Sequence, residues 1–219
     1  MEAVRLDRAF RVLLAAVLAL AAPGCGAQDW VRSADRGGNR LVIEAMQSGS
    51  LQEAVEAARS LGERADPFVS DVVSALLENG RHLLVQFLLH EVFPPAADPD
   101  VIRSKLAANP QVLDRLAAGL ANFGPALRRE TVRLFRVSGL GAHDVQVFAL
   151  AAELERRMRE QEGHLEAEEG ELALEVLEYA ASRGDPDFLD PVLRLQEASR
   201  DRPVARKAAA VARKMVQHR

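Results

Sequence analysis

The stretch Asp185–Met215, DPDFLDPVLRLQEASRDRPVARKAAAVARKM, decides the fold class of this 219-residue chain. Asp185 stands before Pro186 and Asp201 stands shortly before Pro203, so each half begins with a capping side chain and a proline suited to the first helical turn. Leucine and valine recur at helical spacing in the first half. The second half carries one apolar stripe, which we expect to face inward: Val204, Ala208, Val211 and Met215.

The same pairing of a cap and a proline recurs along the chain from Asn39 onward, at Asp66-Pro67, Asp98-Pro99, Asn109-Pro110 and Gly124-Pro125. No segment alternates apolar and polar residues for long enough to predict a strand. The pattern predicts an all-α domain of about eleven helices, with short connections that favour antiparallel pairs. The predicted ranges are about 40–47, 51–61, 66–79, 81–93, 98–108, 109–121, 124–137, 142–162 and 165–182, followed by helices that begin at Asp185 and Asp201.

Residues 109–139, NPQVLDRLAAGLANFGPALRRETVRLFRVSG, look like residues 185–215. Both have a capped proline, a first helix, a turn, a second proline and a basic second helix. Pro110 and Pro186 are 76 residues apart, and Pro125 and Pro203 are 78 apart. These separations are near two units of about 38 residues, a period typical of paired-helix solenoids. Residues 142–182 fit the intervening unit but have longer helices and no matching prolines. The alternative is a non-repetitive helical bundle with two similar hairpins.

At these positions the chain resembles the HEAT-repeat family. Leu189-Asp190-Pro191-Val192-Leu193 nearly follows the Leu-Pro-x-Leu pattern of the first helix in such a unit. Residues 203–210, PVARKAAA, approximate the Pro-x-Val-Arg pattern of the second helix. Residues 109–139 match more loosely, and residues 39–107 match only as helix pairs. The resemblance implies an α-solenoid but no particular chemistry, since a fold does not name a function.

The first 24 residues have the pattern of a signal peptide: three arginines, then the apolar run 12–22, VLLAAVLALAA, then small residues. The run is too short to span a bilayer, which needs about 20 residues. The single cysteine, Cys25, stands just after it, and the site resembles the lipobox of bacterial lipoproteins. Gly24 fits that box, whereas Ala22 replaces its usual leucine and Pro23 is unusual. The resemblance implies acylation at Cys25, with secretion after cleavage behind Ala27 as the alternative.

These features divide the chain into a signal peptide at 1–24, an anchor cysteine and flexible tether at 25–38, and a HEAT-like domain at 39–219. We expect an exported protein that is bound through Cys25 to a bacterial membrane and faces the periplasm or the exterior. Because the chain has one cysteine, it cannot form an internal disulfide or a site with several cysteine ligands. Its formal charge of -4 argues against general nucleic-acid binding.

Charge is unevenly distributed along the domain. Residues 153–178 hold ten acidic residues and three arginines, whereas residues 200–219 hold seven basic residues and one acidic residue. In a HEAT-like unit the second helix usually lines the concave face, so the resemblance implies a basic inner surface that could grip acidic partner helices, anionic headgroups or envelope polymers. The same cations could instead neutralise the acidic unit beside them. The candidate residues are Arg128, Arg129, Arg133, Arg136, Arg206, Lys207, Arg213 and Lys214.

The histidines predict no catalytic or metal site. His90 begins a string like HExxH, but Pro94 stands where the second histidine belongs. We interpret His90 and His164 as surface residues, and the pair His143-Asp144 as a helix cap. No nucleophile elbow or phosphate-binding glycine loop is present in the sequence. We therefore expect a non-enzymatic scaffold for protein–protein interaction, with no cofactor. The alternatives are an envelope-acting enzyme or enzyme subunit and a simple spacer domain.

Overall fold

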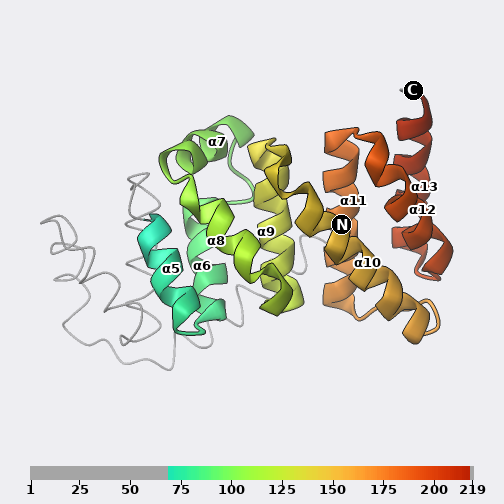
Figure 1. Ribbon diagram of the computed structural model, residues 1–219, viewed down its shortest axis with the longest axis horizontal. Helices are drawn as coiled ribbons and strands as arrows, with labels where there is room; N and C mark the ends of the chain where they lie inside the picture. The colour runs from blue at the N-terminus through green and yellow to red at the C-terminus, as the bar shows by residue number, and fades with distance from the viewer. Residues whose placement is uncertain (1–68, 218–219) are drawn as a thin grey trace, which may run out of the picture. The chain divides into compact units, whose positions relative to one another are not determined.

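The computed structural model describes residues 69–217, which hold nine α-helices and three 3-10 turns and no strand (Figure 1). The all-α prediction is therefore confirmed for this part of the chain. The leader, Cys25, the tether and the predicted helices at 40–47 and 51–61 lie outside the described residues. The chain divides into two compact units, Met1–Val92 and Phe93–Arg219.

The described part of the first unit is a pair of helices, α5 (Val69–Glu78) and α6 (His82–Val92). They pack through apolar faces that include Val72 and Leu76 of α5 and Leu88 of α6, all fully buried. Gly80 ends α5 in the left-handed conformation, at φ 65°, and the Arg81 amide donates back to the Leu76 carbonyl at 2.9 Å. The helix therefore ends within one residue of the predicted end at 79.

The second unit contains the remaining helices. The predicted caps at Asp98 and Asp185 are confirmed, whereas Asn109 does not cap α8: its side chain donates to the Lys105 carbonyl at 3.2 Å and the helix begins after Pro110. Asp98 accepts a hydrogen bond from the Asp100 amide, and Asp185 accepts one from the Asp187 amide. Gly139 and Gly184 end helices in the left-handed conformation. The α-helices are α7 (Pro99–Ala108), α8 (Gln111–Gly119), α9 (Pro125–Ser138), α10 (Asp144–Glu160), α11 (Ala167–Arg183), α12 (Leu189–Ala198) and α13 (Arg202–Gln217).

The core of this unit lies where α11 packs against both α9 and α13, and α12 packs against α13 and α10. Phe135 of α9 and Leu177 of α11 are fully buried, and Tyr179 and Phe188 meet edge to face with ring centres 5.7 Å apart. The predicted inward stripe of α13 is confirmed. Its members are at most 5% exposed: Val204, Ala208, Val211 and Met215.

The loop after α10 is fixed against the loop before α13. Glu162 and Gly163 have φ angles of 57° and 91°, so the chain leaves the helix two residues earlier than the sequence predicts. The Gly163 carbonyl accepts a hydrogen bond from the Arg200 amide at 2.8 Å. A Cβ atom on Gly163 would lie 2.6 Å from Arg200 Cγ and 3.0 Å from the Ala198 carbonyl oxygen, so glycine is required here.

Candidate functional site

The candidate cations on α9 and α13 lie on either side of the acidic helix α11. Arg129 is ion-paired with Glu171, and Arg136 Nε lies 2.7 Å from Glu175 Oε1. On the other flank of α11, Lys207 is ion-paired with Glu178. We call these three pairs the charge seam: Arg129–Glu171, Arg136–Glu175 and Lys207–Glu178. Within the seam, the cations neutralise carboxylates of their own chain.

The seam is half-exposed, so its energetic contribution is small. The side chains of Arg129 and Glu171 keep 40% and 32% of their exposure. Exposed ion pairs of this kind contribute about 0.2–1 kcal/mol each, because water and salt screen them. The three glutamates follow a spacing of four and three residues along α11, which places them on one side of the helix. The sequence shows the spacing of these glutamates but does not show which helices carry the cations that pair with them.

Two of the candidate arginines, Arg128 and Arg133, are buried. Arg128 Nε donates to the Leu120 carbonyl at 3.0 Å and its Nη2 donates to the Ala121 carbonyl at 2.6 Å. Arg133 Nε donates to Glu130 Oε2 at 3.0 Å, and its Nη2 donates to the Phe93 carbonyl. Each guanidinium thus satisfies backbone carbonyls at the end of a neighbouring segment. In these conformations their role is to hold the chain rather than to contact a partner.

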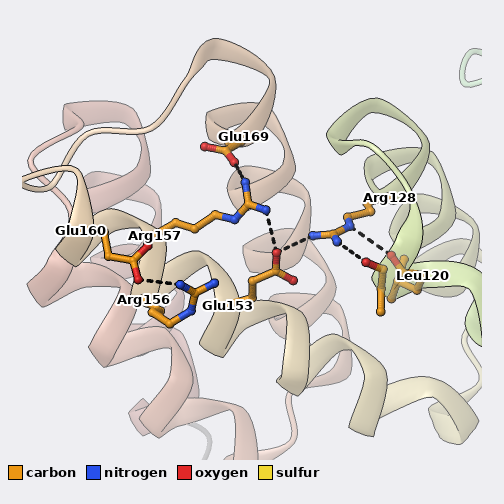
Figure 2. A network of polar contacts seen from close by, with 8 residues as sticks. Leu120, Arg128, Glu153, Arg156, Arg157, Glu160 and Glu169 are labelled. Atoms are coloured by element: carbon orange, nitrogen blue, oxygen red, sulfur yellow. Dashed lines mark hydrogen bonds and ion pairs between the residues drawn. The ribbon is translucent and has the colours of Figure 1, made fainter.

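Figure 2 shows the ionic network that begins at Arg128. Glu153 lies between two arginines: Arg128 Nη1 donates to its Oε1 at 2.9 Å, and Arg157 Nη2 lies 3.0 Å from the same oxygen. Arg157 in turn is ion-paired with Glu169. Burial alone would raise the pKa of Glu153, but hydrogen bonding and charge from Arg128, together with Arg157, lower it below its usual value. Glu153 therefore stays ionised as the centre of the network.

A cavity of about 150 Å³ lies beside this network, between α8 and α10. Arg128 and Glu153 lie on its wall, and Gln146 contributes a buried Oε1 atom that has no hydrogen-bond partner among the described residues. The other lining residues are small or apolar: Ala117, Ala118, Leu120, Ala121, Ala149 and Leu150. The cavity holds no nucleophile paired with a base, so it offers space for a small apolar group rather than a catalytic constellation.

The interpretation of His143-Asp144 as a helix cap is wrong. His143 is buried and stacks on Phe135 with ring centres 4.2 Å apart, and it makes no capping hydrogen bond. Asp144 instead accepts a hydrogen bond from the Tyr179 hydroxyl at 2.6 Å and is ion-paired with Arg183. The two side chains therefore serve contacts with α9 and α11, which local sequence does not reveal.

Burial lowers the pKa of His143, while the charges of Asp114 and Asp144 act in the opposite direction. Burial and the Asp144 carboxylate together raise the pKa of Tyr179. Both rings are therefore neutral near pH 7. His90 and His164 are exposed, so their interpretation as surface residues is confirmed. Across residues 69–217, no group of three or more His, Cys, Asp or Glu side chains is placed to hold a metal ion.

The remaining candidate cations lie on the exposed side of α13. Arg206, Arg213 and Lys214 are exposed, and no ion pair joins them to another residue in the range 69–217. Arg213 Nε donates only to the Ala209 carbonyl of its own helix, at 3.2 Å. Of the eight candidate residues, these three are the ones whose charged groups face solvent without a carboxylate partner in the described structure. They are therefore available to a ligand or partner.

Comparison with known proteins finds no matching family model, no matching curated protein and no matching solved structure. None of the helices in the described part combines the length and apolar character needed to cross a membrane. The case for function rests on the residues themselves.

Proposed function

We propose that this chain is a HEAT-like α-solenoid that is anchored through a lipid at Cys25 and binds a protein partner in a bacterial envelope. The observation that carries the binding role is the contrast between the charge seam, where cations are matched by glutamates, and the exposed side of α13, where Arg206 and Arg213 have no acidic partner in the described structure. Unmatched charge on an ordered helix steers and orients an acidic partner.

Contacts at the helix ends support stacked antiparallel pairs. Arg157, near the end of α10, is ion-paired with Glu169, near the start of α11. At the opposite ends, Asp144 of α10 meets Tyr179 and Arg183 of α11. Such contacts are expected when two consecutive helices run in opposite directions.

Contacts between α9 and α11 support the stacking of one pair on the next. Arg129 and Glu171 both lie in the first half of their helices, and Arg183 near the end of α11 donates to the carbonyl of Gly139, just after α9. Helices that occupy equivalent places in successive solenoid units run in the same direction, and these contacts fit that arrangement.

The anchor is proposed from the sequence alone, because Cys25 lies outside the described residues. Two or three acyl chains on that cysteine would hold the protein at a membrane, whereas one chain binds only marginally. The tether at 25–38, which contains three glycines, would let the domain reach partners near the membrane surface.

The proposal is tested by crosslinking pull-down from intact cells that carry either the natural chain or the Cys25→Ala variant, with intact-mass analysis of both mature proteins. We expect a diacylated or triacylated N-terminus at Cys25 and a set of crosslinked proteins that is lost or strongly reduced in the variant. An unacylated mature chain would refute the anchor. Failure of the natural chain to crosslink any protein would refute the scaffold.

A further inference from the structure

The exposed side of α13 repeats the surface that α9 presents to α11. The buried stripes of the two helices align Leu127 with Val204, Thr131 with Ala208 and Leu134 with Val211, and all six residues are at most 3% exposed. In this register Arg129 corresponds to Arg206, and Arg136 corresponds to Arg213. The two arginines therefore lie on equivalent sides of the two helices.

On α9 this side is already occupied. Arg129 and Arg136 hold Glu171 and Glu175, two carboxylates spaced four residues apart on α11. On α13 the corresponding arginines are exposed and have no ion-pair partner within residues 69–217. Lys207, next in sequence to Arg206, points back to Glu178 of α11. Arg206 and Arg213 lie on the side of α13 opposite its buried stripe, through which α13 packs against α11 and α12.

The surface next to these arginines is partly apolar. Val216 lies three residues after Arg213, hence on the same side of α13, and is 58% exposed. An apolar and cationic surface suits an amphipathic acidic helix. A highly charged polyanion would meet repulsion from a chain whose formal charge is -4.

We propose that Arg206 and Arg213 form a docking edge for an acidic helix of a partner protein, whose two carboxylates four residues apart take the places that Glu171 and Glu175 take on α9. The proposal rests on the proposed scaffold function and adds the chemistry of the partner. The contact between α9 and α11 is the model for this interaction within the chain. There, two arginines seven residues apart pair with two carboxylates of a helix that lies alongside.

The test uses the purified full chain and a fluorescent peptide with the sequence of Ala167–Arg183, blocked at both ends. A lactam staple on the side away from Glu171 and Glu175 keeps this short peptide helical, because isolated helices of this length are marginal in water. Fluorescence anisotropy at low salt measures binding. We expect the double variant Arg206→Ala/Arg213→Ala to bind about tenfold more weakly than the natural chain.

The matched control is Arg115→Ala/Arg156→Ala, which removes two exposed arginines and the same charge from α8 and α10. We expect it to bind the peptide as the natural chain does, and Arg206→Lys/Arg213→Lys to restore most of the lost affinity. A peptide with Glu171→Gln and Glu175→Gln should bind the natural chain about tenfold more weakly than the unchanged peptide does. The Arg206→Ala/Arg213→Ala chain should bind the two peptides with equal affinity. That non-additivity is the signature of a direct pairing.

Three results would overturn the docking edge. They are absence of peptide binding, an equal loss of affinity in both double variants, or additive effects of the protein and peptide changes. The natural chain could instead dimerise with increasing concentration, with only Arg206→Ala/Arg213→Ala abolishing the dimer and with no non-additivity between the protein and peptide changes. That result would assign the edge to a second copy of this chain and refute a partner helix. If the cellular crosslinks persist in Arg206→Ala/Arg213→Ala and the protein and peptide changes act additively, the docking edge is refuted and the proposed scaffold function is not.

Discussion

At the scale of single residues, Arg128 is one of the candidate surface cations that the structure shows to be buried. Arg128 is 8% exposed and donates to two carbonyls at the end of α8 and to Glu153 of α10. Its neighbour Arg129 is half-exposed and has one ionic partner, Glu171. Two adjacent arginines therefore differ in role because one is surrounded by protein and the other by water.

We expect Arg128→Ala to lower the free energy of unfolding by about 3 kcal/mol, since it leaves two backbone carbonyls without a donor and Glu153 with Arg157 as its remaining partner. Arg129→Ala is the matched control and should cost less than about 1 kcal/mol. Urea denaturation followed by circular dichroism measures both. Equal losses would mean that Arg128 is solvated in the native state.

The buried histidine predicts a pH dependence. Because the pKa of folded His143 lies below its unfolded value of 6.5, the unfolded chain binds the proton more readily. Its contribution to stability is therefore complete above about pH 6.5 and is lost as the pH falls below that value.

We expect His143→Phe, which keeps a ring against Phe135, to flatten the dependence of the unfolding free energy on pH between about 5 and 7. His164→Phe changes an exposed histidine and should leave that slope intact. Denaturant titrations at several pH values measure it. An unchanged slope in His143→Phe would show that His143 binds its proton equally readily in the folded and the unfolded chain.

At the scale of elements, helix ends were predictable and helix neighbours were not. The start of α7 at Pro99 and of α9 at Pro125 follows from a cap and a proline, which are local signals. The partners of Asp144 and the match between α9 and α11 depend on residues 35 or more positions away. The sequence shows a basic helix and an acidic helix, and neutralisation of one by the other is an alternative it leaves open, but it contains no local signal of which residues pair.

The loop after α10 gives an element-scale prediction. Gly163→Ala would place a methyl group against Arg200 and the Ala198 carbonyl, in a backbone conformation that alanine disfavours. We expect the variant to lose about 2–3 kcal/mol, measured by chemical denaturation. Gly184→Ala is the control, because φ there is 62° but nothing lies within 4 Å of the new atom. It should lose only about 1 kcal/mol.

At the scale of the whole molecule, many charged side chains within residues 69–217 are paired at or near the surface. Ion pairs on α10, such as Arg156–Glu160 and Arg159–Glu155, lie at the surface within one helix. The pairs of the charge seam are half-exposed as well. Stability of the fold is therefore expected to come mainly from the buried apolar faces.

We expect raising NaCl from about 0.05 M to about 0.5 M to shift the thermal midpoint by only a few degrees, because screening acts on pairs that contribute little. Binding of the stapled acidic peptide should weaken strongly over the same range, since it depends on charges with no other partner. Differential scanning calorimetry and anisotropy measure the two effects. A large fall in the midpoint would mean that the ion pairs sustain the fold.

The order of charges across α9, α11 and α13 also constrains how such a chain can lengthen by tandem duplication. A cationic helix meets an anionic one, which meets a second cationic one. Duplication of a single helix pair would place two helices of like charge next to each other. Duplication of two adjacent pairs together would keep cationic and anionic helices in alternation. The two stretches that look alike in sequence, 109–139 and 185–215, are separated by one helix pair of opposite charge.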